Sequence, residues 1–224
     1  MSEAGENDAP QRRRSHVDHG TVYASVGATA SPDVMRFPPS GSTPYEFELR
    51  IGSGAERFLV ASTALMTWGA QTGVGIRLRD IEQGDGGDYT GVEFDEHGTP
   101  QPVAEADAEY GPDGQPFVAA GTMATLHWPD GRAPRRLRVV YTVNEPRRMG
   151  FAWGTADDDG VIGEELFTVE HRDDDTVWAT VRGFLWEPER GILNRLGKSP
   201  IKQHLKEAQS QLAALVTGVL PAGG

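Results

Sequence analysis

The stretch "SPIKQHLKEAQSQLAALVTG", residues 199–218, decides the fold prediction. Ser199 is a suitable N-cap, and Pro200 fits the first position of a helix. Apolar side chains then recur at spacings of three and four residues, which is the pattern of an amphipathic helix. We expect a helix of about five turns that ends near Gly218. The apolar positions of its stripe are Ile201, Leu205, Ala208, Leu212, Leu215 and Val219.

Segments before this helix alternate between apolar and polar residues, which predicts half-buried strands. "YEFELRI" (45–51) alternates strictly. "RRLRVVYTV" (135–143) also alternates, and we expect its apolar residues to share one face of a strand: Leu137, Val139, Tyr141 and Val143. Between these strands, "AERFLVASTALMTW" (55–68) has apolar residues near helical spacing and predicts one amphipathic helix.

The stretch "GFAWGTADDDGVIGEELFTVE" (150–170) reads as a curved hairpin. Its first strand has large side chains on one face and only Gly150, Ala152 and Gly154 on the other. Such small residues indicate a bend or the close approach of another backbone. The three aspartates at 157–159 are expected to form a solvated turn.

The order of elements predicts an α+β fold, in which a curved antiparallel sheet grips a long C-terminal helix. This helix-grip arrangement resembles that of pollen-allergen and START-type lipid-transfer proteins. Those proteins usually have paired short helices after the first strand, whereas this sequence predicts only one.

Five motifs carry a closer resemblance. They are "VYASVGAT", "LRIGSGAERFLVASTALMTW", "VVYTVNEPRRMGFAWGT", "GEELFTVE" and "SPIKQHL". Their order is similar to that of the DUF-nineteen-ninety family, an uncharacterised domain family, over roughly residues 23–215. The resemblance implies a fold and no activity. The family commonly has His-Pro shortly before "GEE", and this chain has "DDDGVIGEE" without a histidine.

Composition limits the remaining possibilities. Residues 1–20 are polar and without periodicity, so we expect a disordered tail, followed by a single α+β domain over 21–220. A Gly- and Pro-rich insertion at about 80–131 holds 12 acids and no lysine or arginine, so it accounts for the net charge of −12. This charge argues against nucleic-acid binding. The three lysines, at 198, 202 and 206, predict a solvated stripe or a docking site for the insertion.

The chain has no cysteine and no apolar run long enough for a membrane span. We expect a soluble cytoplasmic protein. The histidines have no zinc-site spacing, "GSG" before the first helix lacks the residues of a phosphate loop, and "DDDG" does not match a calcium loop. We therefore predict no metal, no cofactor and no catalytic residue.

The predicted function is binding of a small apolar or amphipathic molecule between sheet and helix. The candidate ligand-binding residues are Tyr141, Phe151, Trp153, Glu165 and Phe167, with Glu165 near the pocket mouth. Glu164 and Glu165 should point to opposite faces of a strand, one of them toward solvent. The alternatives are an enzyme with Glu165 and Tyr141 as acid/base groups, or a packed protein-interaction module whose aromatics only fill the core.

Overall fold

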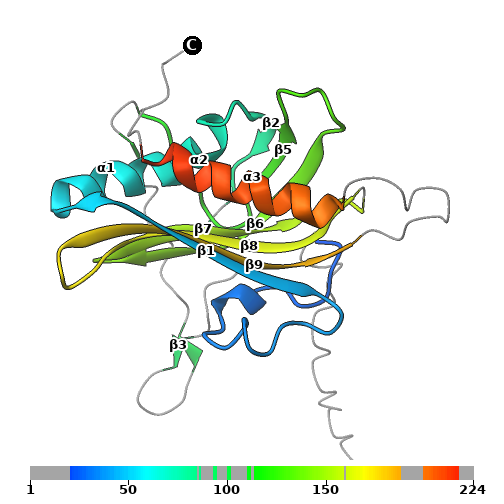
Figure 1. The fold of residues 1–224 in the computed structure, drawn as a ribbon, viewed down its shortest axis with the longest axis horizontal. Coiled ribbons are helices and arrows are strands. Elements are labelled where there is room, and N and C mark those ends of the chain that lie inside the picture. Colours follow the sequence, from blue (N-terminus) through cyan, green and yellow to red (C-terminus); the bar gives the residue numbers. More distant parts are fainter. Residues whose placement is uncertain are drawn as a thin grey trace, which may run out of the picture.

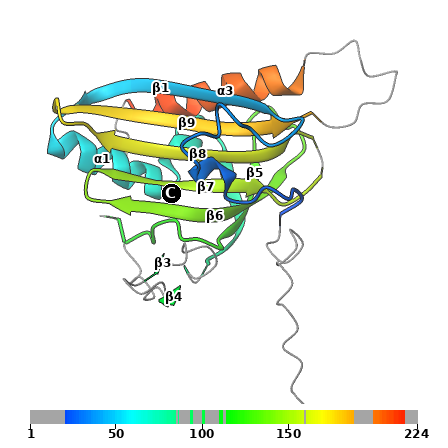
Figure 2. The same cartoon turned by 90° about the horizontal axis from the view of Figure 1, so that it is seen from below.

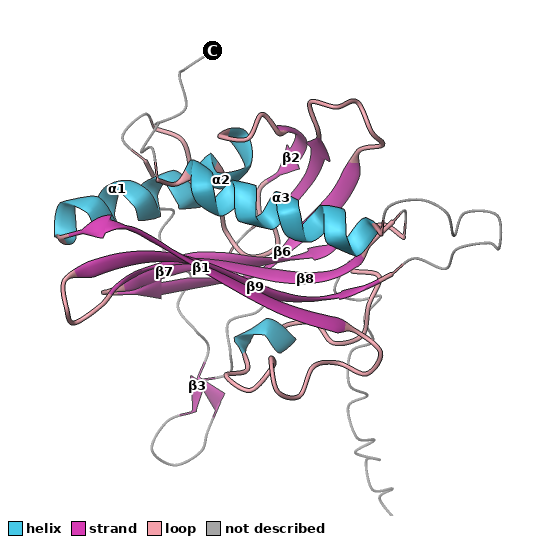
Figure 3. Cartoon of the chain, in the orientation of Figure 1, coloured by secondary structure: helices cyan, strands magenta, loops and turns pink. Residues whose placement is uncertain are grey.

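The computed structural model describes residues 21–84, 86, 93–94, 100–101, 110–111, 114–158, 160–187 and 199–216. Seven antiparallel strands form a curved sheet in the order β1–β9–β8–β7–β6–β5–β2 (Figure 1, Figure 3). Its strands are β1 (Thr43–Ser53), β2 (Arg77–Glu82), β5 (Met123–His127), β6 (Arg135–Glu145), β7 (Arg148–Thr155), β8 (Ile162–His171) and β9 (Thr176–Trp186). A separate pair joins β3 (Glu93–Phe94) to β4 (Pro100–Gln101).

Three helices cover one face of the sheet. They are α1 (Ala55–Met66), α2 (Gly69–Thr72) and α3 (Pro200–Ala214). The N-terminal segment, with the short helix η2 (Ala28–Ala30), lies against the opposite face (Figure 1, Figure 2). The predicted α+β helix-grip fold is confirmed.

The helix predicted over 55–68 is observed as α1, which ends at Met66, and the short helix α2, which was not predicted, follows it at Gly69–Thr72. Trp68 has a φ of 65°, in the left-handed region that large residues rarely adopt, and it separates α1 from α2. Its ring packs 5.0 Å from the ring of Phe151 and 6.0 Å from that of Trp153. Packing against the sheet therefore holds a backbone conformation that the helical spacing of the sequence does not reveal.

The stripe of α3 packs on the sheet as predicted. Ala208 and Leu212 are 1% and 2% exposed, whereas Leu205 is only partly buried. Lys202 and Lys206 are exposed on the other side of the helix. The helix ends at Ala214, earlier than predicted, and Lys198, Gly218 and Val219 lie outside the described residues.

Tyr141 lies on the face of the sheet opposite to the predicted one. The pairing of β6 with β7 shifts between Val139 and Tyr141, so Val140 is an extra, bulged residue. Val139 stays in the core under the helices, whereas Val140 and Tyr141 pack with Leu166 on the other face. One extra residue inverts the alternation, because side chains of a strand alternate with a period of two.

The small residues of β7 do accommodate a neighbouring segment, as predicted. A Cβ atom at Gly154 would lie 2.7 Å from the ring of Tyr23, and the amide of Val22 donates to the carbonyl of Thr155 at 3.2 Å. At Gly150 a Cβ atom would lie 2.9 Å from the Cα of Thr168, its cross-strand partner in β8, so the two backbones approach closely there as well.

The predicted tail at residues 1–20 lies outside the described residues, and so do residues 85, 87–92, 95–99, 102–109 and 112–113 of the predicted insertion. The end of the segment predicted as an insertion belongs to the domain itself, because β5 pairs in the sheet and Val118 and Ala120 are buried. None of the helices in the described part of the chain is long and apolar enough to cross a membrane.

Candidate functional site

A cavity of about 290 Å³ lies between the first half of α3 and the adjoining ends of β5, β6, β7 and β8. Its apolar wall comes from the sheet and the β7–β8 connection, and it includes Leu126, Leu137, Trp153, Val161 and Leu185. Its polar wall comes from α3, from β8, from the start of β6 and from the segment that joins β5 to β6. These polar residues are Arg132, Arg135, Arg136, Glu165, Gln203, His204, Glu207 and Gln211.

Glu165 is the buried acid of this wall, and it is 4% exposed. One carboxylate oxygen accepts a hydrogen bond from the Tyr45 hydroxyl. The other accepts from Trp153 Nε1 at 2.9 Å and forms an ion pair with His204 Nε2 at 2.9 Å. The carboxylate thus joins β8 to β1, β7 and α3 at a single point.

The register of the sheet brings these groups together. Glu165 of β8 pairs with Trp153 of β7 on one side and with Gly183 of β9 on the other. Gly183 in turn pairs with Tyr45 of β1. Gly183 leaves the space that the Tyr45 side chain crosses to reach the carboxylate. A Cβ atom there would lie 3.1 Å from both the Tyr45 hydroxyl and its ring.

The contacts of Glu165 set the protonation states of the site. Burial by itself raises the pKa of Glu165. The charge of His204 and the hydrogen bonds from His204, Tyr45 and Trp153 have a larger, opposite effect, so the pKa of Glu165 lies below its ordinary value. Burial by itself lowers the pKa of His204. The neighbouring Glu165 carboxylate has a larger, opposite effect, so the pKa of His204 lies above its ordinary value. Burial and the same carboxylate raise the pKa of Tyr45 well above 10. A charged Glu165–His204 pair with a neutral Tyr45 is therefore favoured.

Glu164 forms a second buried site on the opposite face of the sheet, where it is fully buried. It accepts hydrogen bonds from the Tyr23 hydroxyl (2.6 Å), the Gly27 amide (2.8 Å) and both the amide (2.9 Å) and hydroxyl (2.6 Å) of Thr29. The Thr29 hydroxyl has a single proton, which it donates to Glu164. In its 2.8 Å contact with the Tyr141 hydroxyl, Tyr141 is therefore the donor. Burial raises the pKa of Glu164, and the four donors oppose that shift.

These contacts correct one prediction. Glu164 and Glu165 do point to opposite faces, but neither is solvated. The N-terminal segment covers one carboxylate and α3 covers the other. A strand-start glutamate is usually exposed, and only the covering segments make both of these buried.

The five candidate ligand-binding residues are not all brought together. Trp153 and Glu165 line the cavity. Phe151 and Phe167 share their face of the sheet but lie in the fully buried core. Tyr141 lies on the other face with Thr29, so it cannot act with Glu165 on one bound molecule.

Sequence reasoning missed His204. It lies three residues after Ile201 and four before Ala208, so it belongs to the buried stripe by spacing alone. A histidine in an otherwise apolar stripe was the signal that could have identified it. Its partner could not be deduced, since that depends on how α3 docks on the sheet.

Asp157 is not part of a solvated turn, in contrast to the prediction. Its carboxylate accepts from Arg135 Nε at 2.6 Å and from the Arg136 amide at 2.5 Å. Arg135 also donates to the Val161 carbonyl at 2.9 Å. Asp157 therefore positions an arginine of the cavity wall. Asp158 is exposed, as expected, and Asp159 lies outside the described residues.

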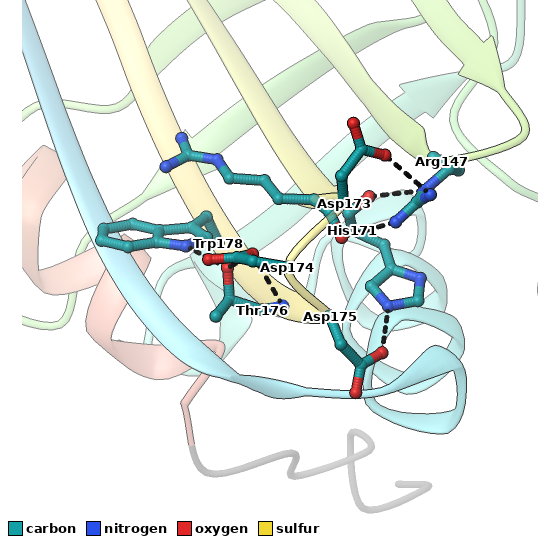
Figure 4. A network of polar contacts seen from close by, with 8 residues as sticks. Arg147, His171, Asp173, Asp174, Asp175, Thr176 and Trp178 are labelled. Carbon is teal, nitrogen blue, oxygen red and sulfur yellow. Dashed lines mark hydrogen bonds and ion pairs between the residues drawn. The ribbon is translucent and has the colours of Figure 1, made fainter.

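A separate polar network closes the β8–β9 turn, at the end of β8 remote from the cavity (Figure 4). Arg147 Nε donates to the His171 carbonyl at 2.7 Å, and Asp174 accepts from the hydroxyl of Thr176 at 2.6 Å. His171 Nε2 lies 2.8 Å from Asp175. These groups satisfy one another, which is typical of a structural turn. The residues that the structure describes include no group of three His, Asp or Glu side chains that could hold a metal ion.

Residues 114–199 match the family model described as "Domain of unknown function (DUF1990)". No curated protein matches the chain in sequence. Among solved structures, the chain is similar to hypothetical protein jhp0584 from Helicobacter pylori at 13% identity, over 84% of this chain and 93% of that chain, with a TM-score of 0.49.

Two further solved structures are similar to the chain. Protein BH1534 from Bacillus halodurans has 15% identity, and the match covers 80% of this chain and 97% of that chain, with a TM-score of 0.38. Ara h 8.0201 has 9% identity over 78% of this chain and 97% of that chain, with a TM-score of 0.41. The predicted resemblance is thus confirmed over residues 114–199, where the chain is similar to the DUF1990 family of domains of unknown function.

Proposed function

We propose that this chain binds a small amphipathic molecule in the cavity between α3 and the sheet. The observation that carries the proposal is a cavity of about 290 Å³ whose wall combines apolar side chains with the ion pair of the buried Glu165 and the partly exposed His204. Ligand sites are typically concave, mostly apolar and supplied with a few fixed polar groups. This composition supports binding over a fully packed interaction module.

The size and the wall limit the ligand. Typical ligand pockets hold about 300–1,000 Å³, so this cavity is at the small end and favours a compact molecule or a short chain over a long lipid. Leu126, Leu137 and Val161 offer an apolar surface, and Trp153 adds a large flat one. Burial of such surfaces supplies about 25 cal/mol per Å² of apolar area removed from water.

Native mass spectrometry of protein purified from its own cells tests the proposal. We expect a co-purified small molecule in the wild type and its loss in Trp153→Phe, which removes both ring area and the hydrogen bond to Glu165. Trp178→Phe is the matched control, because Trp178 stacks on Arg172 at 4.4 Å and does not line the cavity. A wild-type protein that carries no small molecule, and whose tryptophan fluorescence responds to no compound of a small amphipathic library, contradicts the proposal.

An enzyme that uses the same cavity is the second candidate, and the Glu165–His204 contact favours it. A carboxylate that orients an imidazole is a common proton-transfer arrangement. Tyr141 has no place in this alternative, because it lies on the other face of the sheet. Glu165→Gln separates the two candidates, since an enzyme would lose turnover while it still bound the molecule identified by mass spectrometry.

A further inference from the structure

Glu165, the buried acid of the cavity wall, has little capacity left to accept hydrogen bonds, and one oxygen of Glu207 is paired. Glu165 already accepts from Tyr45 and Trp153 and pairs with His204. Glu207 is paired with Arg132 Nη1 at 2.5 Å. A bound molecule that needs acceptors from the protein would have to compete with these internal partners.

Two donors beside the same wall have no hydrogen-bond partner in the described part of the chain. Trp128 Nε1 and Arg132 Nε are buried atoms without a hydrogen-bond partner among the described residues, although Arg132 Nε lies 3.5 Å from the Asp130 carboxylate as an ion pair. The guanidinium of Arg132 stacks 4.2 Å from the Trp128 ring centre, so the two donors are close together. Buried polar groups usually have a partner. Both atoms are covered by their neighbours, so an acceptor in the cavity reaches them once the Arg132 side chain, which is 30% exposed, shifts.

His204 adds a third donor. Its Nε2 faces Glu165 at 2.9 Å, so Nδ1 is the ring nitrogen left to contact a molecule in the cavity. The His204 side chain is 26% exposed, which leaves the ring accessible. When protonated by its pairing with Glu165, the imidazole donates from both nitrogens.

The wall supplies several cationic donors, most of which are already paired with carboxylates. Three arginines and His204 line the cavity beside Glu165 and Glu207, and Asp130 and Asp157 pair with Arg132 and Arg135. Arg135 is held by Asp157 at 2.6 Å, and Arg136 is exposed at the cavity rim. Paired guanidinium groups still bind a carboxylate, because each has five N–H donors.

We propose that the cavity recognises a small monocarboxylic acid, whose carboxylate accepts hydrogen bonds from Arg132 and His204 and whose apolar part lies against Leu126, Leu137 and Val161. This inference rests on the proposed ligand-binding function and specifies its ligand class. The donors at the wall then fix the orientation of the molecule, with its charged end beside α3.

Titration calorimetry of the full chain with octanoate, octan-1-ol and octylamine tests this inference, because the three compounds differ only in their polar end. We expect octanoate to bind at least about tenfold more tightly than octylamine. Arg132→Gln and His204→Gln should each remove most of this preference, while the affinity for octan-1-ol changes less than about threefold. Arg79→Gln is the matched control, because Arg79 is exposed in β2 and does not line the cavity.

The possible outcomes separate the two proposals. Equal or tighter binding of octylamine overturns the carboxylate inference and leaves ligand binding in place. A preference for octanoate that persists in both variants also overturns it, provided that circular dichroism shows both variants folded. If none of the three compounds binds at millimolar concentration, the carboxylate inference fails, and native mass spectrometry still tests the binding proposal by itself.

Discussion

Glu164 and Glu165 are neighbours in β8, yet their carboxylates lie on opposite faces of the sheet and each is enclosed in its own hydrogen-bonded site. Glu164 holds the N-terminal segment through Tyr23, Gly27 and Thr29. Glu165 holds α3 through His204. Two adjacent residues therefore attach the two segments that cover the sheet, one on each side.

Glu164→Gln should destabilise the fold by on the order of 3 kcal/mol, because an amide cannot accept from all four donors and leaves buried groups unpaired. Glu46→Gln is the control, because Glu46 is exposed in β1. Urea unfolding measures the loss. Hydrogen exchange should also show that Gly27 and Thr29 amides lose protection, and unchanged protection there would contradict the anchoring role of Glu164.

The stability that the Glu165–His204 pair adds should depend on pH. The pKa of His204 is raised in the fold, so its contribution is fully present below its ordinary value of 6.5 and is lost as pH rises through the folded pKa. The pKa of Glu165 is lowered, so its contribution is present above its ordinary value of 4.5 and is lost as pH falls through the folded pKa. The pair should therefore contribute most between about pH 4.5 and 6.5.

A double-mutant cycle with Glu165→Gln and His204→Gln, repeated across pH, measures this coupling free energy. Glu207 also acts on His204 electrostatically, so Glu207→Gln is included as a reference. A coupling energy that does not change with pH would mean that the two side chains do not form a charged pair.

Gly183→Ala should cost about 1–3 kcal/mol, since its Cβ atom would press on the Glu164 backbone carbonyl and on the Tyr45 side chain. The change should also weaken the contact of Tyr45 with Glu165. Tyr45→Phe removes only the hydroxyl, so the double variant should lose less stability than the sum of the single ones. Strict additivity in chemical unfolding would show that Gly183 acts without Tyr45.

Leu212→Ala should destabilise by about 2–5 kcal/mol, the usual range for a buried leucine, because Leu212 is 2% exposed between α3 and the sheet. Leu205→Ala should cost less, since Leu205 is only partly buried. Lys202→Ala on the exposed face of α3 should change the free energy of unfolding by less than about 0.5 kcal/mol. Equal losses for Lys202 and Leu212 in thermal unfolding would contradict the observed docking of the helix.

Two truncations test the N-terminal region. A chain that begins at Thr21 should melt within about 4 °C of the full chain, because residues 1–20 offer few apolar side chains for burial. A chain that begins at Ser31 removes Tyr23 and Thr29, leaves Glu164 without its donors, and should melt far lower. Similar melting temperatures for the two truncations would show that the segment before Ser31 is dispensable.

Local patterns in the sequence were enough to predict the α+β architecture. Alternation in "YEFELRI" predicted β1, and the stripe through Ile201, Ala208 and Leu212 predicted the face that α3 buries. Both patterns are local, because the periods of strand and helix are properties of the backbone. Trp153 and Glu165 could be placed on a common face for the same reason.

The contacts between residues far apart in the chain become known from the folded structure alone. The bulge at Val140 carries Tyr141 to the other face, since a single extra residue inverts all later positions of a strand. The contact of Glu165 with His204 depends on the docking of α3, and its contact with Tyr45 depends on a register that runs across β9 and β1. Such pairings join residues far apart in the chain, and the local periodicity that predicts a helix or strand holds no information about them.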